Sequence, residues 1–235
     1  KTKAPDEPLE PRQVVRKYKG TVVSVEACNA DGDITGTGSG LIVSKEGYVL
    51  TNGHVVHDDD TNAPCPKFFV AWDESLKRKK VPATLVGYTF RMRGEASLWG
   101  TDVALLKIPP GDYEPLPLTP LAEVEPGDGV VTMGFPSRNK LPGVSLTVTR
   151  GVVTRMNRNV RGKVDTIYVD AAFTHGSSGG PCVSLVTGGA IGLNTFSSDV
   201  KLDQRFQDWN DLINYFGVIP TTDIFQTFPL VTQLG

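Results

Sequence analysis

Residues 176–185 read GSSGGPCVSL, a loop of glycine and serine that runs directly into a short apolar segment. Glycine lacks a Cβ and adopts backbone conformations that other residues avoid, so this loop can turn tightly. The apolar segment after it has the length of a strand, and residues 190–194 form another after a run of turn residues. The loop is therefore predicted to lie between stretches of β-structure.

The same strand pattern extends outward over the rest of the chain. Short runs rich in Val, Ile, Leu, Thr and Tyr are separated by Gly, Pro, Asn and Asp, which is typical of strands rather than helices. One series of predicted strands covers residues 21–27, 40–44, 48–51, 68–72 and 103–108. A second series covers residues 129–133, 145–154, 166–169, 181–185, 190–194 and 216–220. The pattern predicts an all-β protein built in two halves.

A proline-rich segment, PPGDYEPLP at residues 109–117, separates the two series and is predicted to be an extended connector. In the C-terminal tail, Thr221 or Thr222 is expected to cap a last short helix that Pro229 disturbs. Ahead of it, an apolar spacing of three and four predicts a short amphipathic helix that includes Phe206, Trp209, Leu212 and Ile213. The predicted boundaries are an extension at 1–19, a first half at 20–108, a linker at 109–124, a second half at 125–220 and a tail at 221–235.

The composition argues against several classes of function. The formal net charge is −2 over 235 residues, which provides no electrostatic basis for binding nucleic acid. No run of 18 apolar residues occurs, so no membrane span is expected. Cys28, Cys65 and Cys182 lack the paired spacings of zinc sites, and we expect neither a metal site nor a disulfide framework. Cys182 is expected to be buried and to behave as a small hydrophobic residue. The cellular localisation of the protein stays open.

Ser178 is the candidate nucleophile of the glycine loop. A serine hydroxyl is a weak nucleophile, so attack on a carbonyl requires a nearby base and N–H donors aimed at the developing oxyanion. The backbone N–H groups of Gly176 and Ser178 are the candidate donors, because glycines at 176 and 179 allow the loop to bring them together. The alternative is an ordinary turn rich in glycine and serine.

The base must come from one of three histidines. His54 follows an apolar strand directly, so its side chain can project from a rigid support, and it is the candidate general base. His57 lies beside three aspartates and is expected on an exposed loop, with a weak divalent-cation site as the alternative. His175 is too near Ser178 along the chain to act as its base, and we expect it at the rim of a substrate site.

Asp102 is the candidate partner of the histidine. It opens the apolar segment DVALLKI at residues 102–108, where an unpaired charge would be costly. A carboxylate beside a catalytic imidazole holds its second nitrogen and stabilises the imidazolium. A structural ion pair or a turn cap is the alternative role.

These motifs, in the order TNGHVV (51–56), DVALL (102–106) and GSSGGP (176–181), resemble the trypsin-like peptidases, and in particular the HtrA/Deg branch. Further similar motifs are GTGSGLIV (36–43), MGFP (133–136), DAA (170–172) and AIGLNT (190–195). The resemblance implies two perpendicular six-stranded β-barrels with His54, Asp102 and Ser178 as a catalytic triad between them, and residues 20–235 as one protease domain. It implies no metal or organic cofactor.

The resemblance also implies where substrate binds. The base of the pocket for the residue before the cleaved bond is expected near Ala172 and Phe173, with Asn194 and Thr195 on the facing wall. None of these side chains is acidic, so we expect cleavage after small or medium aliphatic residues, in unfolded or flexible protein segments, with a role in protein quality control. The smallest assembly in this branch is usually a homotrimer, to which Val14, Val15 and Tyr18 are expected to contribute.

The sequence departs from the branch at several places. Its members usually carry PDZ domains after the protease, and no part of this sequence fits one. Ser177 stands where Asn is common, Thr174 and His175 replace Asn-Pro, and residues 196–215 form a longer connection.

Two other functions therefore stay open: a silent peptide-binding or chaperone-like pseudo-protease, and a narrow-specificity processing peptidase. A basic cluster is either solvated charge or a surface for an acidic partner or adjacent subunit, and consists of Arg150, Arg155, Arg158, Arg161 and Lys163.

Overall fold

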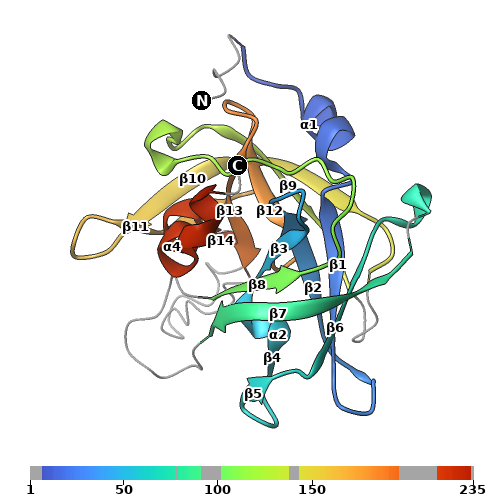
Figure 1. The fold of residues 1–235 in the computed structure, drawn as a ribbon. Helices are drawn as coiled ribbons and strands as arrows, with labels where there is room; N and C mark the ends of the chain where they lie inside the picture. The colour runs from blue at the N-terminus through green and yellow to red at the C-terminus, as the bar shows by residue number, and fades with distance from the viewer. Residues whose placement is uncertain (1–6, 78, 91–101, 138–142, 196–215, 234–235) are drawn as a thin grey trace, which may run out of the picture.

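The computed structural model describes residues 7–77, 79–90, 102–137, 143–195 and 216–233, and within them the chain forms two closed antiparallel β-barrels (Figure 1). The first barrel has the strand order β1-β2-β3-β8-β7-β6. Its strands are β1 (Val22–Cys28), β2 (Ile34–Ile42), β3 (Tyr48–Thr51), β6 (Lys67–Ala71), β7 (Val81–Thr89) and β8 (Val103–Lys107). The short helix α2 (Gly53–Val56) follows β3, and β4 (His57–Asp58) pairs with β5 (Ala63–Pro64) outside the barrel.

The second barrel has the order β10-β11-β14-β13-β12-β9. Its strands are β9 (Gly129–Gly134), β10 (Thr147–Arg158), β11 (Val164–Val169), β12 (Pro181–Ser184), β13 (Ala190–Thr195) and β14 (Phe216–Pro220). The expectation of two six-stranded barrels is thus confirmed. Short helical segments complete the described chain: α1 (Pro11–Tyr18), η1 (Glu74–Leu76), η2 (Leu121–Glu123), α4 (Thr221–Thr227) and η4 (Pro229–Gln233).

Most strands lie where the sequence pattern predicted them, and β3 and β14 have the predicted bounds. The strand β7 was not predicted. Its sequence contains Pro82 and Gly87, two residues that weaken a strand pattern. The barrel accommodates both. Pro82 pairs with Phe69 of β6 and lies before Thr84, where the pairing of β7 with β8 begins, and the register shifts between Leu85 and Gly87.

The helix α1 is another element that the sequence pattern did not predict. Pro11 occupies its first turn, and Glu10 and Gln13 form a capping box, so the charged, proline-rich segment contains its own start signal. Val14 and Tyr18 are 1% and 5% exposed and pack into the protein's own core. These two side chains are therefore not available to a subunit interface, and of the expected trimer contacts only Val15 is partly exposed.

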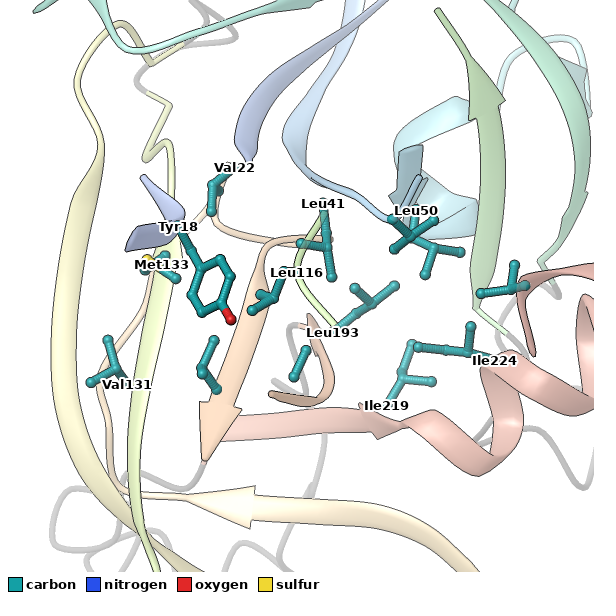
Figure 2. Packing of buried hydrophobic residues seen from close by; sticks show 14 of the residues in the cluster. Tyr18, Val22, Leu41, Leu50, Leu116, Val131, Met133, Leu193, Ile219 and Ile224 are labelled. Carbon is teal, nitrogen blue, oxygen red and sulfur yellow. The ribbon is translucent and has the colours of Figure 1, made fainter. Parts of the chain in front are cut away.

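A hydrophobic cluster joins the two barrels (Figure 2). Val22, Leu41 and Leu50 approach it from the first barrel, while Met133 and Leu193 approach it from the second. The proline-rich connector adds Leu116, and α1 and α4 add Tyr18 and Ile224. Each barrel also has a separate interior cluster, since alternate residues of a strand face opposite sides of the sheet. The shared cluster fixes the barrels relative to each other, and with them the residues between them.

The C-terminal helix α4 begins after Pro220, which occupies the cap position, so the prediction of a Thr221 or Thr222 cap is wrong. The Thr221 hydroxyl instead donates to the Thr119 carbonyl, 2.7 Å away, and so connects α4 to the linker between the barrels. Lys163, from the β10–β11 turn, forms an ion pair with the buried Asp223 of α4. The predicted amphipathic helix around residues 206–213 lies outside the described residues.

Candidate active site

His54 is held at the junction of a strand and a short helix. The strand β3 ends at Thr51, Asn52 caps α2, and His54 lies in the first turn of that helix. The Asn52 side chain donates to the backbone carbonyl of Asp102 over 2.9 Å. The segments that carry the histidine and the aspartate are therefore also joined through the Asn52 side chain.

The Asp102 carboxylate binds His54 twice. One oxygen, Oδ1, accepts the backbone N–H of His54 at 2.7 Å, and Oδ2 lies 2.6 Å from the ring atom Nδ1. Burial lowers the pKa of His54, but the charge and the hydrogen bond of Asp102 outweigh it, so the pKa is raised above the ordinary 6.5. With Nδ1 facing the carboxylate, Nε2 is the ring atom left to exchange protons with another group.

Thr195 completes the surroundings of the carboxylate. Its hydroxyl donates to Asp102 Oδ2 over 3.3 Å, from the last residue of β13 in the other barrel. We expected Thr195 on the wall of the substrate pocket, and no sequence signal pointed to this contact. It arises because β13 ends beside the first barrel, where a hydroxyl can reach the carboxylate.

The serine loop consists of two consecutive tight turns. The N–H of Ser177 donates to the carbonyl of Thr174 at 2.9 Å, and the N–H of Gly180 donates to the carbonyl of Ser177 at 3.1 Å. The third residues of these turns, Gly176 and Gly179, have φ values of +88° and +85°. A type II turn requires this left-handed backbone at its third residue, which explains the glycine at both positions. Ser178 lies at the second position of the second turn and is 5% exposed.

The backbone of this loop leaves two donors unused. Within the described residues, the N–H groups of Gly176 and Ser178 donate to no protein acceptor. The His175 carbonyl accepts the N–H of Ser137 at 2.9 Å. Because a trans peptide directs its N–H opposite its carbonyl, the N–H of Gly176 points away from Ser137. Two free N–H groups on consecutive turns are what an oxyanion site needs.

The serine loop lies against the segment that carries His54. A Cβ added to Gly179 would come within 2.4 Å of Thr51 Oγ1 and 3.0 Å of the Asn52 backbone nitrogen, so glycine allows this close approach. Among the described residues, no hydrogen bond joins the Ser178 hydroxyl to His54. The structure thus brings the three predicted residues to one region, with the His54–Asp102 contact already formed.

The residues predicted to bind substrate differ in their exposure. Ala172 and His175 are exposed, whereas Phe173 is 6% exposed and packs against Phe216 at a ring distance of 4.8 Å. Asn194 is completely buried and donates to the Met133 carbonyl over 3.3 Å. It has no exposed surface for a substrate side chain to contact, so its expected place on the pocket wall is corrected to a structural role between strands.

His57 is not exposed as we expected, because its side chain is only 6% accessible. Its ring packs 4.8 Å from that of Phe90 and 6.1 Å from that of Tyr88, which cover it. Asp59 Oδ1 lies 3.9 Å from Nε2. Over the described ranges, no group of three or more His, Cys, Asp or Glu side chains is arranged to hold a metal.

All three cysteines are free and buried, as expected for Cys182. No helix in the described part of the chain has the length and apolar character to cross a membrane.

The two barrels, with a histidine–aspartate pair beside a serine loop, define a class of protein, and comparison with known families agrees. A family model described as "Trypsin-like peptidase domain" matches residues 38–193. The chain therefore belongs to the family of trypsin-like peptidase domains.

Within this family, the chain is similar to DegP-like proteins. A probable periplasmic serine endoprotease DegP-like from Hahella chejuensis is 35% identical over 161 residues, which are 68% of this chain and 29% of the relative. A protein of the same description from Brucella suis is 35% identical over 162 residues, which are 67% of this chain and 27% of that protein. The crystal structure of the serine endoprotease from Yersinia pestis superposes with a TM-score of 0.68 at 25% identity, covering 97% of this chain and 68% of that one. The expected resemblance to the HtrA/Deg branch is confirmed, and the chain spans less than a third of these curated relatives.

Proposed function

We propose that this protein is a serine endopeptidase in which Ser178 is the nucleophile, His54 the general base and Asp102 the residue that orients His54. The 2.6 Å contact between His54 Nδ1 and Asp102 Oδ2 carries the proposal, since it leaves Nε2 to accept the serine proton. The descriptions of the DegP-like relatives as serine endoproteases support the same activity.

The reaction would proceed through an acyl-enzyme. Ser178 Oγ attacks the peptide carbonyl as its proton moves to His54 Nε2, and the N–H groups of Gly176 and Ser178 donate to the oxyanion. Collapse of the tetrahedral intermediate breaks the C–N bond, and His54 gives its proton to the leaving amine. Water then attacks the ester with His54 again as base, which releases the acid product and restores the Ser178 hydroxyl.

For the substrate, we propose unfolded or flexible protein segments with a small or medium aliphatic residue before the cleaved bond, as in protein quality control. Exposed Ala172 and His175 are the candidate contacts beside the serine loop, and Thr195 is a candidate at the pocket edge. None of them is acidic, so a lysine or arginine side chain would lack a partner. Strict cleavage after Lys or Arg in a peptide library would contradict this specificity.

The activity is tested with a fluorophosphonate probe, which labels activated serines. We expect labelling of the wild type and none of Ser178→Ala, together with Ser178-dependent cleavage of an unfolded protein such as reduced, alkylated casein. Ser177→Ala is the matched control, since it removes the neighbouring hydroxyl and leaves the nucleophile. A folded wild type that is neither labelled nor cleaves casein would favour the pseudo-protease that binds peptides.

A further inference from the structure

Ser39 lies in the first barrel, yet both its hydroxyl and its backbone N–H donate to the serine loop of the second. It belongs to β2, inside the motif GTGSGLIV, and is 0% exposed. Its hydroxyl donates to the carbonyl of Gly176 at 2.6 Å, across 137 positions of sequence. Its backbone N–H donates to the carbonyl of Ser178 at 2.7 Å. One residue thus holds two of the carbonyls that surround the candidate oxyanion donors.

Two further hydrogen bonds, accepted by the hydroxyl and by the backbone carbonyl, fix the position of Ser39 itself. The hydroxyl accepts the N–H of Phe135 at 2.8 Å, so both its donor and acceptor capacities are used. The Ser39 carbonyl accepts the Thr51 hydroxyl at 2.7 Å, and Thr51 is the last residue of the strand that leads to His54. Ser39 therefore connects the approach to the histidine, the end of β9 and the serine loop.

These contacts determine which way the loop peptides face. Four consecutive carbonyls accept hydrogen bonds: that of His175 from Ser137, that of Gly176 from Ser39, that of Ser177 from Gly180 and that of Ser178 from Ser39. With the four carbonyls occupied, the N–H groups of Gly176 and Ser178 are left directed away from the protein partners. Within the described residues, the His175 carbonyl also accepts the Thr174 hydroxyl at 3.4 Å, but the backbone N–H of Ser137 holds it as well. The Gly176 carbonyl is the one of the four held by a side chain alone, so a substitution can release it selectively.

We infer that Ser39 is a positioning residue for the oxyanion site, which it orders through the Gly176 carbonyl. The inference rests on the proposed peptidase function of Ser178. Without the Ser39 hydroxyl, the peptide between Gly176 and Ser177 keeps only the hydrogen bond from the Ser177 N–H to the Thr174 carbonyl, at 2.9 Å. Its carbonyl end can then rotate, because a glycine at its N-terminal side imposes little barrier. Such a rotation moves the donors on both sides of it, and a misplacement near 1 Å is enough to slow catalysis about a hundredfold.

The test compares Ser39→Ala with Ser184→Ala in steady-state peptide hydrolysis. Ser184 is also fully buried, and its hydroxyl accepts the N–H groups of Val186 and Thr187, which are not part of the serine loop. We expect Ser39→Ala to lower kcat by about ten- to a hundredfold with KM within about twofold of wild type. Ser184→Ala should retain wild-type kcat even where its loss of thermal stability is similar.

A second readout reports on the oxyanion itself. A peptidyl trifluoromethyl ketone forms a hemiketal with the active serine, and its affinity depends on the oxyanion donors, whereas KM for the matching peptide does not. Ser39→Ala should weaken this inhibitor in proportion to its loss of kcat. If Ser39→Ala does not fold, Ser39→Cys replaces it, because a cysteine side chain has the same connectivity as serine and its thiol is a weak donor. Its expected loss of kcat is smaller but in the same direction.

The outcomes separate the two proposals. A wild type that shows no Ser178-dependent labelling refutes the peptidase function and this inference together. An active wild type, with kcat and inhibitor affinity unchanged in the folded Ser39 variant, overturns the inference alone. A parallel loss of kcat in Ser184→Ala would also overturn it, since general destabilisation would then explain the effect.

Discussion

The Asp102 carboxylate accepts the backbone N–H of His54 at 2.7 Å and lies 2.6 Å from Nδ1 of its ring. It also accepts the hydroxyl of Thr195 at 3.3 Å. The backbone contact fixes the carboxylate relative to α2, so the ring contact does not depend on side-chain rotamers alone. The hydroxyl of Thr195 comes from the opposite barrel. The orientation of His54 is therefore coupled to the packing between the barrels.

Asp102→Asn should lower kcat by about 10⁴-fold while the protein stays folded. The amide would present an N–H or a weaker acceptor to Nδ1, so the imidazole would no longer be held in the tautomer with a free Nε2. The measurement is steady-state hydrolysis beside the circular dichroism spectrum. A loss of less than about tenfold would show that Asp102 does not orient the base.

The rate of labelling by a fluorophosphonate probe should rise with pH through a pKa above 6.5, because His54 must be neutral to act as base. In Asp102→Asn the charge and the hydrogen bond of Asp102 are lost. Burial, the largest influence, still lowers this pKa and only the smaller influence of the Asp59 charge still raises it, so the midpoint should move below 6.5. Labelling rates over a pH series provide the measurement. A midpoint that is the same in both proteins would contradict the assignment.

The same pKa predicts how the free energy of unfolding changes with pH. A raised pKa means that folded His54 binds its proton more tightly than unfolded His54. Its contribution to stability should therefore be complete below pH 6.5 and lost as pH rises through the folded pKa. Urea unfolding of the wild type and of His54→Ala over this window tests the sign, and the wild type should lose more stability than the variant.

Thr195→Val should reduce kcat/KM by about three- to tenfold, the effect of one ordinary hydrogen bond. Valine keeps the shape of threonine, so packing at the end of β13 is preserved. Thr195→Ser retains a hydroxyl and should stay near wild type. If Thr195→Ser lost as much activity as Thr195→Val, the methyl group rather than the hydroxyl would be the part that matters.

Tyr18→Ala should lower the free energy of unfolding by about 2–4 kcal/mol, because a buried ring is removed from the cluster between the barrels. Arg12→Ala, on the exposed side of the same helix, should change it by less than about 0.5 kcal/mol. Denaturant titration of both variants is the measurement. Equal stability of the two would show that α1 does not hold the barrels.

The three thiols should be inert in the native protein. Cys28, Cys65 and Cys182 are 2%, 3% and 0% exposed, and burial raises the pKa of each thiol. A thiol reagent such as 5,5′-dithiobis(2-nitrobenzoate) should react slowly with the folded chain at pH 8 and with three thiols after unfolding without reductant. Fewer than three would indicate a disulfide.

Local patterns identified much of this protein from sequence. The strands at Tyr48–Thr51 and Phe216–Pro220 were predicted at their observed bounds, because apolar runs between turn residues are a local signal. The glycines at 176 and 179 indicated a strained loop, and both have the positive φ that two tight turns require. The order of the His54, Asp102 and Ser178 motifs sufficed to point to the family.

The tertiary structure decided the contacts between residues that are distant in sequence. The contact of Ser39 with Gly176 spans 137 positions, and that of Thr195 with Asp102 spans 93. Such pairs depend on how each barrel closes and on which side chains face the other barrel, neither of which appears in a local pattern. The burial of Asn194 and His57 has the same origin. The sequence determined which chemical groups the protein has, and the packing of the barrels determined how the serine loop at residues 176–181 is held.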